Sequence, residues 1–351
     1  MLQVTAKERA ARLVVTAISL SLFIFHVLPA SALPGDTIQL VRARGYLRCG
    51  VSEGIAGFSM RDSTGNWSGI DVDFCRAVAA VVLGNPNKVE FISLRATARF
   101  PALYSREIDI LARNTTWTVE REAVFSVIFV GILYADSQGF LARADSPFAH
   151  GDTLDGARIC VEEGTNQLDD LQKFADGQGW HITPVIYSDM ASGHKDLADG
   201  SCSVLTDDIS ALTEMLLHVP DRSAYVLRPE RIAKEPLGPA VRWDDGQWLV
   251  LVRAVYAVLI DAEERGLTQV QAKEIPATGG TPQQRAYVHE AARIGRALGI
   301  PRNWAALAVA SVGNYGEMFD RNLGGLSTLK LERGLNRPWT QGGLLYAPPF
   351  Q

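Results

Sequence analysis

The sequence of 351 residues lacks the features of several common classes of protein. It has no dense run of Lys and Arg, and its formal net charge is -5, so it is a poor partner for a phosphate backbone and nucleic acid is not expected to bind. It has no internal repeat or low-complexity tract. With 47% hydrophobic and 21% charged residues, it has the composition of an ordinary globular chain, long enough for two domains or one large one.

Catalytic and metal-binding motifs are also missing. The chain contains no C-x-x-C, G-x-S-x-G, H-E-x-x-H or P-loop sequence. Its six histidines, at positions 26, 150, 181, 194, 218 and 289, are scattered and lack the spacing of metal ligands. We therefore expect no catalytic residue, no metal site and no cofactor.

The N-terminus has the order of a secretory signal peptide. Three basic residues precede a 16-residue apolar run (13–28), and Pro29 leads into the small-x-small pattern Ala30-Ser31-Ala32. A single transmembrane anchor is the alternative, but this run is short for a bilayer span, and no later segment is apolar enough to cross a membrane. The pattern predicts a signal peptide over residues 1–32, cleaved near Ala32, and a periplasmic mature protein.

Four cysteines lie beyond the predicted cleavage site, at positions 49, 75, 160 and 202. An even number of cysteines in an oxidising compartment indicates two disulfides, although four buried thiols are the alternative. The sequence alone leaves three pairings open.

Short β-like runs alternate with helical stretches after residue 36. Strands are predicted over 46–51, 89–93, 108–112, 157–161, 183–187 and 203–206. Helices are predicted over 71–83, 98–104 (capped by Thr97), 166–177, 210–218, 248–264, 283–298 and 304–321. The alternation is typical of an α/β fold with mostly parallel sheets flanked by helices. Because the two β/α series have no long linker between them, they predict two lobes with a cleft.

Ligands of open α/β sheets bind outside the carboxyl ends of the strands, so the loops after the strands are the candidate site. The loop over residues 113–121 concentrates hydroxyl, amide and guanidinium groups where a helix begins. Such a helix start favours an anion, and Arg121 can add a bidentate grip on a carboxylate. The alternative is that Thr118 only caps the helix and Arg121 is solvated.

The second series ends its strands in Gly164-Thr165 and in Asp207-Asp208. Thr165 offers a hydroxyl and an N–H, and an aspartate there can receive an ammonium group, although these residues can also simply begin helices. Since adjacent residues at a strand end point to opposite sides, we expect one of the two aspartates to face the cleft. A cation from one lobe and a carboxylate from the other complement an α-amino acid zwitterion.

Several longer segments carry a resemblance to a known family. They are Gly69-Ile-Asp-Val-Asp-Phe-Cys-Arg-Ala77, Arg113-Asn-Thr-Thr-Trp-Thr118, Lys234-Glu-Pro-Leu-Gly-Pro-Ala-Val-Arg242, Val312-Gly-Asn-Tyr-Gly-Glu317 and Gly342-Gly-Leu-Leu-Tyr-Ala-Pro-Pro349. Over about residues 36–351 the sequence resembles family 3 of the extracellular solute-binding proteins, the polar amino acid-binding proteins of ABC transporters. Within that family it is similar to the general L-amino acid-binding subgroup.

The resemblance implies the type II periplasmic binding protein fold, with two lobes that close by a hinge and a helical C-terminal extension. Lobe one would hold residues 36–136 and 236–351, and lobe two residues 137–235. The implied function is to bind a free L-amino acid and deliver it to the permease subunits of an ABC transporter in the inner membrane. A monomer is expected. The preferred amino acids do not follow from the sequence.

The resemblance also assigns site residues. Arg121 resembles the arginine that binds the ligand carboxylate, with Asn114 and Thr116 as polar residues beside it. Thr165 resembles the lobe-two residue that donates to the same carboxylate. Asp208, in preference to Asp207, resembles the aspartate that receives the ligand ammonium.

Two further expectations concern the ligand side chain. Phe58 resembles the aromatic residue that packs on it. The turn over residues 162–167 departs from the family pattern, and Glu162 and Glu163 would repel an acidic ligand if they faced the cleft.

The division into lobes favours the pairs Cys49–Cys75 and Cys160–Cys202, because each pair then stays within one lobe. A crosslink between the lobes would oppose hinge closure.

The same fold also hosts periplasmic enzymes, such as cyclohexadienyl dehydratases, and ligand-sensing domains. The absence of catalytic motifs and the match of the C-terminal segment to the carrier subgroup favour a binding protein over both alternatives.

Overall fold

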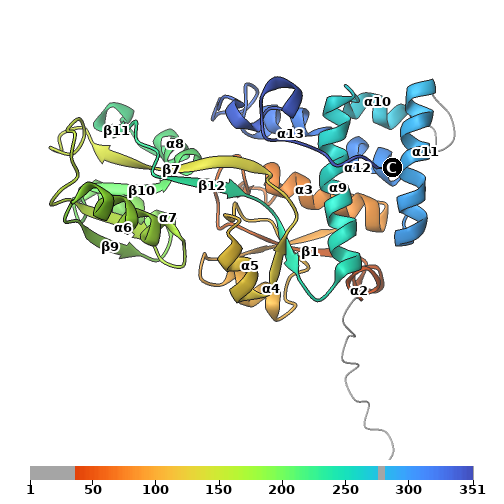
Figure 1. The fold of residues 1–351 in the computed structure, drawn as a ribbon, viewed down its shortest axis with the longest axis horizontal. Helices are drawn as coiled ribbons and strands as arrows, with labels where there is room; N and C mark the ends of the chain where they lie inside the picture. Colours follow the sequence, from red (N-terminus) through yellow and green to blue (C-terminus); the bar gives the residue numbers. More distant parts are fainter. Residues whose placement is uncertain (1–35, 276–280, 351) are drawn as a thin grey trace, which may run out of the picture. The chain divides into compact units, whose positions relative to one another are not determined.

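A computed structural model describes residues 36–275 and 281–350 of the chain. The signal peptide predicted over residues 1–32 lies outside the described residues. In the described part, most strands belong to two mixed sheets with helices on their faces, and further helices follow along the chain (Figure 1).

The first sheet has the strand order β4-β1-β5-β13-β6. Its strands are β1 (Leu47–Val51), β4 (Val89–Ser93), β5 (Ile110–Leu111), β6 (Val127–Phe129) and β13 (Ala240–Arg242). β1 is parallel to β4 and β5, as the alternation of strands and helices predicts, whereas β13 is antiparallel to β5 and β6. A separate hairpin pairs β2 (Met60–Arg61) with β3 (Trp67–Ser68).

Side chains alternate between the two faces of this sheet and join two apolar clusters. Ile110 and Ala112 belong to the larger cluster with α3 (Ile70–Leu83) and α9 (Gly246–Glu264). Leu111, between them, belongs to a smaller cluster with α4 (Arg99–Tyr104). The remaining helices of this part of the chain are α2 (Thr37–Arg44) and α5 (Val119–Phe125).

The second sheet has the order β11-β7-β10-β8-β9, and β12 also pairs with β7. Its strands are β7 (Tyr134–Arg143), β8 (Arg158–Glu162), β9 (Thr183–Tyr187), β10 (Val204–Asp208), β11 (Tyr225–Leu227) and β12 (Ala233–Leu237). β8 is parallel to β9 and β10, and β7 is antiparallel to its three neighbours. Each sheet therefore has the expected parallel strands and antiparallel ones that the sequence pattern did not indicate.

The second sheet is also covered on both faces. Ile159 and Val161 pack in a cluster with α6 (Gln167–Gln178), whereas Cys160 packs in a cluster with α7 (Met190–Ala198) and α8 (Ile209–His218). One short 3-10 helix, Arg222–Ala224, leads into β11. The alternation places the carboxyl ends of β8 and β10, where Glu162 and Asp208 lie, at one edge of this sheet.

Two short connections join the sheets, between β6 and β7 and between β12 and β13. The strands of the second sheet begin at Tyr134 and end at Leu237, so they extend two or three residues beyond the predicted limits of lobe two. The assignment of residues 36–136 and 236–351 to lobe one, and of 137–235 to lobe two, stays a prediction.

The C-terminal part contains α10 (Gln269–Glu274), α11 (Pro282–Leu298), α12 (Trp304–Val312) and α13 (Tyr315–Asn322), followed by the 3-10 turns Gly334–Asn336 and Trp339–Gln341. The single helix predicted over 304–321 is wrong, because the chain breaks between α12 and α13. Gly313 has a φ of +90°, which L side chains rarely adopt. Asn314 then begins α13 with a capping box, in which its side chain accepts from the Glu317 N–H at 2.9 Å.

The predicted cap of α4 is also wrong. The helix begins after Ala98 and has no side-chain hydrogen bond at its N-cap. Thr97 instead lies against the turn before α6, because a Cβ added to Gly164 would come within 2.8 Å of the Thr97 Cγ2. The contact leaves no room for a side chain at residue 164.

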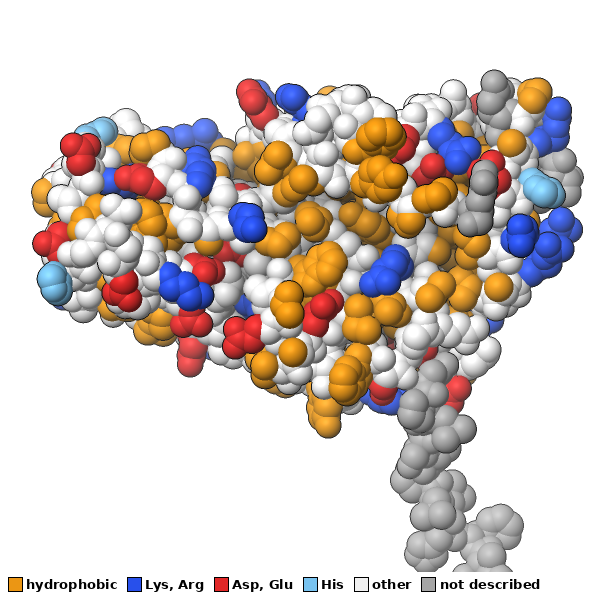
Figure 2. Space-filling view, viewed as in Figure 1, with side chains coloured by type: hydrophobic (Ala, Val, Ile, Leu, Met, Phe, Trp, Pro, Cys, Tyr) orange, Lys and Arg blue, Asp and Glu red, His pale blue; other side chains and the backbone are white. Residues whose placement is uncertain are grey.

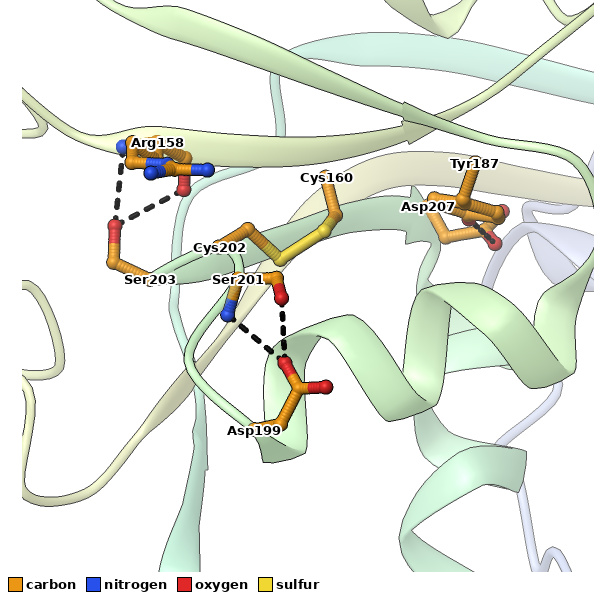
Figure 3. Close-up of a disulfide and its surroundings, with 8 residues drawn as sticks. All are labelled: Arg158, Cys160, Tyr187, Asp199, Ser201, Cys202, Ser203 and Asp207. Carbon is orange, nitrogen blue, oxygen red and sulfur yellow. Dashed lines mark hydrogen bonds between the residues drawn. A yellow bond between two sulfur atoms is a disulfide. The ribbon is translucent and has the colours of Figure 1, made fainter.

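The cysteines form the two disulfides expected from the lobe division, Cys49–Cys75 and Cys160–Cys202. Figure 3 shows the second bridge beside the turn over residues 199–203, which hydrogen bonds hold at both ends. Asp199 accepts from the Ser201 N–H at 3.0 Å, and Ser203 Oγ accepts from the Arg158 N–H at 3.1 Å.

Charged side chains of both signs are mixed on the surface. On the face drawn in Figure 2, Lys and Arg lie among acidic and neutral side chains and do not form one continuous basic surface. Among residues 36–275 and 281–350, no helix combines the length and apolarity needed to cross a bilayer.

We predict that removing the Cys160–Cys202 bridge with a Cys160→Ala/Cys202→Ala variant lowers the free energy of unfolding by about 3–4 kcal/mol. The bridge closes a loop of 42 residues, and the chain-entropy model gives this magnitude. Urea unfolding of the oxidised variant and wild type measures the difference. Non-reducing peptide mapping that paired Cys49 with Cys202 would contradict the connectivity.

Candidate functional site

Polar side chains from the strand ends of both sheets surround a small buried cavity. They come from α4, the loop between β5 and α5 and the first turn of α5 on one side, and from the ends of β8 and β10 with the start of α6 on the other. The lining residues are Arg99, Arg113, Asn114, Thr116, Arg121, Glu162, Thr165, Asn166, Gln167, Asp207 and Asp208. Five of the six predicted ligand-binding residues are among them: Asn114, Thr116, Arg121, Thr165 and Asp208.

Phe58 is the predicted residue that the structure does not bring to this cavity. Its side chain is 1% exposed and lies in the apolar core, with its ring centroid 5.5 Å from that of Tyr134 in an edge-to-face contact. Ile55, three residues earlier, lines a neighbouring cavity instead. The position of Phe58 therefore does not support a contact with the ligand side chain.

Arg121 lies in the first turn of α5, with its guanidinium buried. The Thr118 hydroxyl caps the helix by accepting from the Arg121 N–H at 3.1 Å, and Arg121 Nη1 donates to the Thr116 carbonyl at 2.6 Å. The guanidinium carbon is 5.6 Å from the centroid of the Phe100 ring. Burial lowers the pKa of Arg121, while Glu235 and Asp208 oppose this shift. The alternative of a solvated Arg121 is thus wrong, although Thr118 does cap the helix.

Two more buried arginines lie beside Arg121, and sequence reasoning missed both. Arg99 donates from Nη2 to the Gly164 carbonyl at 3.0 Å, and Arg113 donates from Nε to the Leu94 carbonyl at 2.8 Å. Burial lowers the pKa of each guanidinium. Arg113 opens the segment that already contained Asn114 and Thr116, so its position could have suggested a role. Arg99 has no comparable local signal.

Both strand-end aspartates line the cavity, so the expectation that one of them faces it is wrong. Asp208 ends β10 and is also the N-cap of α8, where the chain leaves the strand and the alternation of side chains no longer holds. Burial raises the pKa of both carboxyl groups.

The two aspartates differ in how many protein donors they have. Asp207 accepts from Gln167 Nε2 and the Asp208 N–H, each at 2.7 Å, and from the Tyr187 hydroxyl at 3.3 Å (Figure 3). Within the described part of the chain, Asp208 accepts from Gln167 Nε2 alone, at 3.2 Å. Asp208 therefore retains more capacity to accept a hydrogen bond from a ligand.

Glu235 of β12 connects the two sides of the site and was not predicted to have a role. Its carboxylate accepts from the Thr116 hydroxyl and, at 2.9 Å, from Asn166 Nδ2. Burial raises the pKa of Glu235 to about 7, although Arg121 opposes the shift. The Thr165 hydroxyl is also engaged, since it donates to the Glu162 carbonyl at 2.8 Å.

Three buried polar atoms of the lining residues have no hydrogen-bond partner in the described structure. They are a donor, Arg99 Nε, and two acceptors, Asn114 Oδ1 and Gln167 Oε1. A buried donor or acceptor without a partner costs about 1–3 kcal/mol. The site therefore favours a ligand that carries an anionic group and a separate donor group.

A second cavity of about 230 Å³ adjoins the first and shares Arg113, Asn114, Glu162 and Asp207 with it. Its other lining residues are Ser52, Glu53, Gly54, Ile55, Asp189, Met190 and Ala191. Among the described residues, no group of three or more His, Cys, Asp or Glu is arranged to hold a metal ion.

Residues 47–279 match the family model of the bacterial extracellular solute-binding proteins, family 3. The chain belongs to this family. The general L-amino acid-binding periplasmic protein AapJ of Rhizobium johnstonii is 41% identical to this chain, and the match covers 92% of this chain and 95% of AapJ. The glutamate/glutamine/aspartate/asparagine-binding protein BztA of Rhodobacter capsulatus is 40% identical, over 92% of this chain and 96% of BztA.

A solved structure shows the same fold. It is an ABC transporter periplasmic binding protein from Brucella ovis with glutathione bound, 38% identical to this family 3 protein, with a TM-score of 0.85. The match covers 90% of this chain and 100% of that one. The prediction of a type II periplasmic binding protein fold is confirmed.

Glu235 should make the stability of this family 3 protein depend on pH. Its pKa of about 7 is above the ordinary value of 4.5, so the folded protein binds more protons than the unfolded chain between these values. The stabilisation is present below about pH 4.5 and is lost as the pH rises through about 7. We expect a larger free energy of unfolding at about pH 5.5 than at about pH 8, and a smaller difference for Glu235→Gln.

Urea unfolding at the two pH values tests this expectation. The exposed Glu107→Gln serves as the control and should keep the wild-type difference. An unchanged difference in Glu235→Gln would mean that Glu235 is not the source.

Proposed function

We propose that this chain binds one free α-amino acid across these two adjoining cavities and delivers it to the permease of an ABC importer in the inner membrane. The observation that carries the proposal is the set of unpartnered buried atoms, one donor on Arg99 and acceptors on Asn114 and Gln167. An α-amino acid zwitterion supplies a carboxylate for the first and an ammonium group for the others.

The carboxylate end is assigned to the arginine side of the cavity. Arg121 uses Nη1 for the Thr116 carbonyl, and no other hydrogen bond engages its guanidinium among the described residues. The remaining donors of this guanidinium have the planar arrangement that binds a carboxylate in a bidentate manner. Arg99 adds a further donor on this side, and the N–H groups of the turn at Thr165 can add donors from the opposite side of the cavity.

The ammonium end is assigned to Asp208. This carboxylate is buried and has a single donor among residues 36–275 and 281–350, so a cation beside it gains a strong, charge-assisted hydrogen bond. Asp207 already accepts from three protein donors and is the less suitable partner. A ligand held by Arg121 and Asp208 contacts elements of both sheets, and it shifts a hinge equilibrium through its higher affinity for the closed state.

Family membership and the N-terminal sequence support export. Residues 1–32 have the order of a cleaved signal peptide, and the family consists of extracellular solute-binding proteins. We infer a soluble, monomeric periplasmic protein with a permease as partner, acting without cofactor or catalysis.

A longer ligand is the second candidate, because the adjoining cavity offers about 230 Å³ beyond the groups that hold the zwitterion. The related Brucella ovis protein has glutathione bound. The glutamyl end of glutathione is itself an α-amino acid, so the same Arg121 and Asp208 contacts would serve for it.

A thermal-shift screen of the mature protein against twenty amino acids and glutathione tests the proposed function. A ligand at a hundredfold excess over its Kd adds about 2.7 kcal/mol of stability, which gives a clear rise in Tm. Incubation with prephenate, arogenate or peptidoglycan should leave these compounds unchanged. Turnover of any of them, or the absence of a shift with every amino acid, would contradict a binding protein for amino acids.

The roles of the two aspartates are tested with matched substitutions. Asp208→Asn should weaken an amino acid by roughly tenfold or more, because a charge-assisted hydrogen bond to the ammonium is lost, and should weaken its 2-keto analogue little. Asp207→Asn, the matched control, should have the smaller effect on the amino acid. Calorimetric titrations of both variants with both ligands measure this. Equal, small losses would mean that neither carboxylate holds the ammonium.

A further inference from the structure

Arg113 and Glu162 are two of the four residues that line both cavities, and they face each other without a hydrogen bond. Their exposed fractions are 5% and 8%, and Arg113 Nη2 is 3.8 Å from Glu162 Oε1. Arg113 uses only Nε, for the Leu94 carbonyl. Among the described residues, no hydrogen bond engages its terminal nitrogens or the Glu162 carboxylate. The pair thus presents unused donors and unused acceptors side by side.

The other carboxylates of the larger cavity are already engaged. Glu53 and Asp189 both face Arg95, at 3.5 and 3.7 Å, and Asp207 accepts from three protein donors. Glu162 is paired in the same way with Arg113, at 3.8 Å, but among the described residues it is the buried acid of this cavity whose carboxylate accepts no hydrogen bond. The exposed Glu163 lines neither cavity.

A terminal carboxamide on the ligand side chain satisfies both members of the pair. Its carbonyl oxygen accepts from Arg113, and its NH2 group donates to the Glu162 carboxylate. A terminal carboxylate also accepts from Arg113, but it meets an ionised Glu162 as a like charge. Once Glu162 holds a proton, its O–H donates to that carboxylate, and the repulsion by Glu162 is removed. A cationic side chain can pair with a carboxylate of this cavity, but it meets Arg113 as a like charge and cannot accept a hydrogen bond from it.

We propose that Arg113 and Glu162 together select amino acids whose side chains end in a carboxamide or a carboxylate, and that the carboxylate binds with one proton taken up by Glu162. This inference rests on the proposed function. It assigns the ligand side chain to the larger cavity, where Ile55, Met190 and Ala191 can contact its methylene groups.

The surroundings of Glu162 support the proton uptake. Arg113 from the loop after β5 and Arg99 of α4 favour the ionised form. Asp207 at the end of β10 and Glu53 after β1 oppose it, and Tyr187 of β9 and Asp189 at the start of α7 also lie nearby. Burial outweighs the arginines and raises the pKa of Glu162 to about 7. Between about pH 6 and 8 the proton is therefore available at modest cost.

Calorimetric titrations of the mature protein with glutamine, glutamate and alanine at about pH 6, 7 and 8 test the proposal. With a pKa near 7, the protonated fraction of Glu162 falls about tenfold over this range, so glutamate should bind about tenfold more weakly at pH 8 than at pH 6. Glutamine and alanine should change by less than about threefold over the same range. Titrations in buffers of different ionisation enthalpy should show uptake of close to one proton with glutamate at pH 8.

Three variants separate the roles of the pair. Glu162→Gln should abolish the pH dependence of glutamate binding, and the matched control Glu163→Gln should keep it. Arg113→Met should weaken glutamine and glutamate by about tenfold or more, since a charge-assisted hydrogen bond is lost, and alanine by less than about threefold. If Arg113→Met folds poorly, Arg113→Lys replaces it. Because this variant keeps the charge, it should retain part of the glutamate affinity.

The outcomes distinguish this proposal from the proposed function. If no amino acid binds wild type, both fail. If alanine binds as tightly as glutamine and glutamate, if glutamate affinity shows no extra pH dependence, or if Arg113→Met weakens alanine as much as glutamate, the assignment of Arg113 and Glu162 is wrong. In those cases amino-acid binding itself stands.

Discussion

Charged side chains are buried at the carboxyl ends of strands from two different sheets, where neither sheet alone supplies enough partners for them. Arg99 of α4 donates to the Gly164 carbonyl beyond β8, and Glu235 of β12 accepts from Thr116 on one side and Asn166 on the other. Because an unpaired buried charge is expensive, each side of the site is completed by the other. The donors and acceptors that remain without a protein partner determine which polar groups a ligand must supply.

The parts of the site that follow directly from a strand end could be predicted from the sequence. Thr165 and Asp208 lie within four residues of the ends of predicted strands, and Arg121 lies in the loop-and-helix segment after another, so the α/β pattern places all three near the carboxyl ends of strands. Arg99 and Glu235 could not be found in this way, because their partners are 65 and 119 residues away in the chain. The role of Phe58 was inferred from the family resemblance, and the structure places its side chain in the apolar core, which the resemblance alone could not reveal.

Most of the fold could be predicted from the sequence, since the helices and parallel strands follow from the local periodicity of apolar residues. The antiparallel strands β7, β12 and β13 were not, because they owe their place to neighbours from other parts of the chain. The same distinction separates Asp207 from Asp208. In the sequence both are acidic residues at the end of a strand. The hydrogen bonds in the structure show that Asp208 keeps more capacity to accept from a ligand.

The order of the strands in the chain has a consequence for the order in which the two sheets can form. Every strand of the second sheet, and its Cys160–Cys202 bridge, lies within the continuous segment Tyr134–Leu237. The first sheet needs β13, residues Ala240–Arg242, between β5 and β6, so β4-β1-β5 and β6 have no strand to join them until that later segment is available. A chain that emerges N-terminus first therefore finishes its second sheet while its first is still incomplete. Oxidation of Cys160 and Cys202 can precede completion of the sheet that contains Cys49.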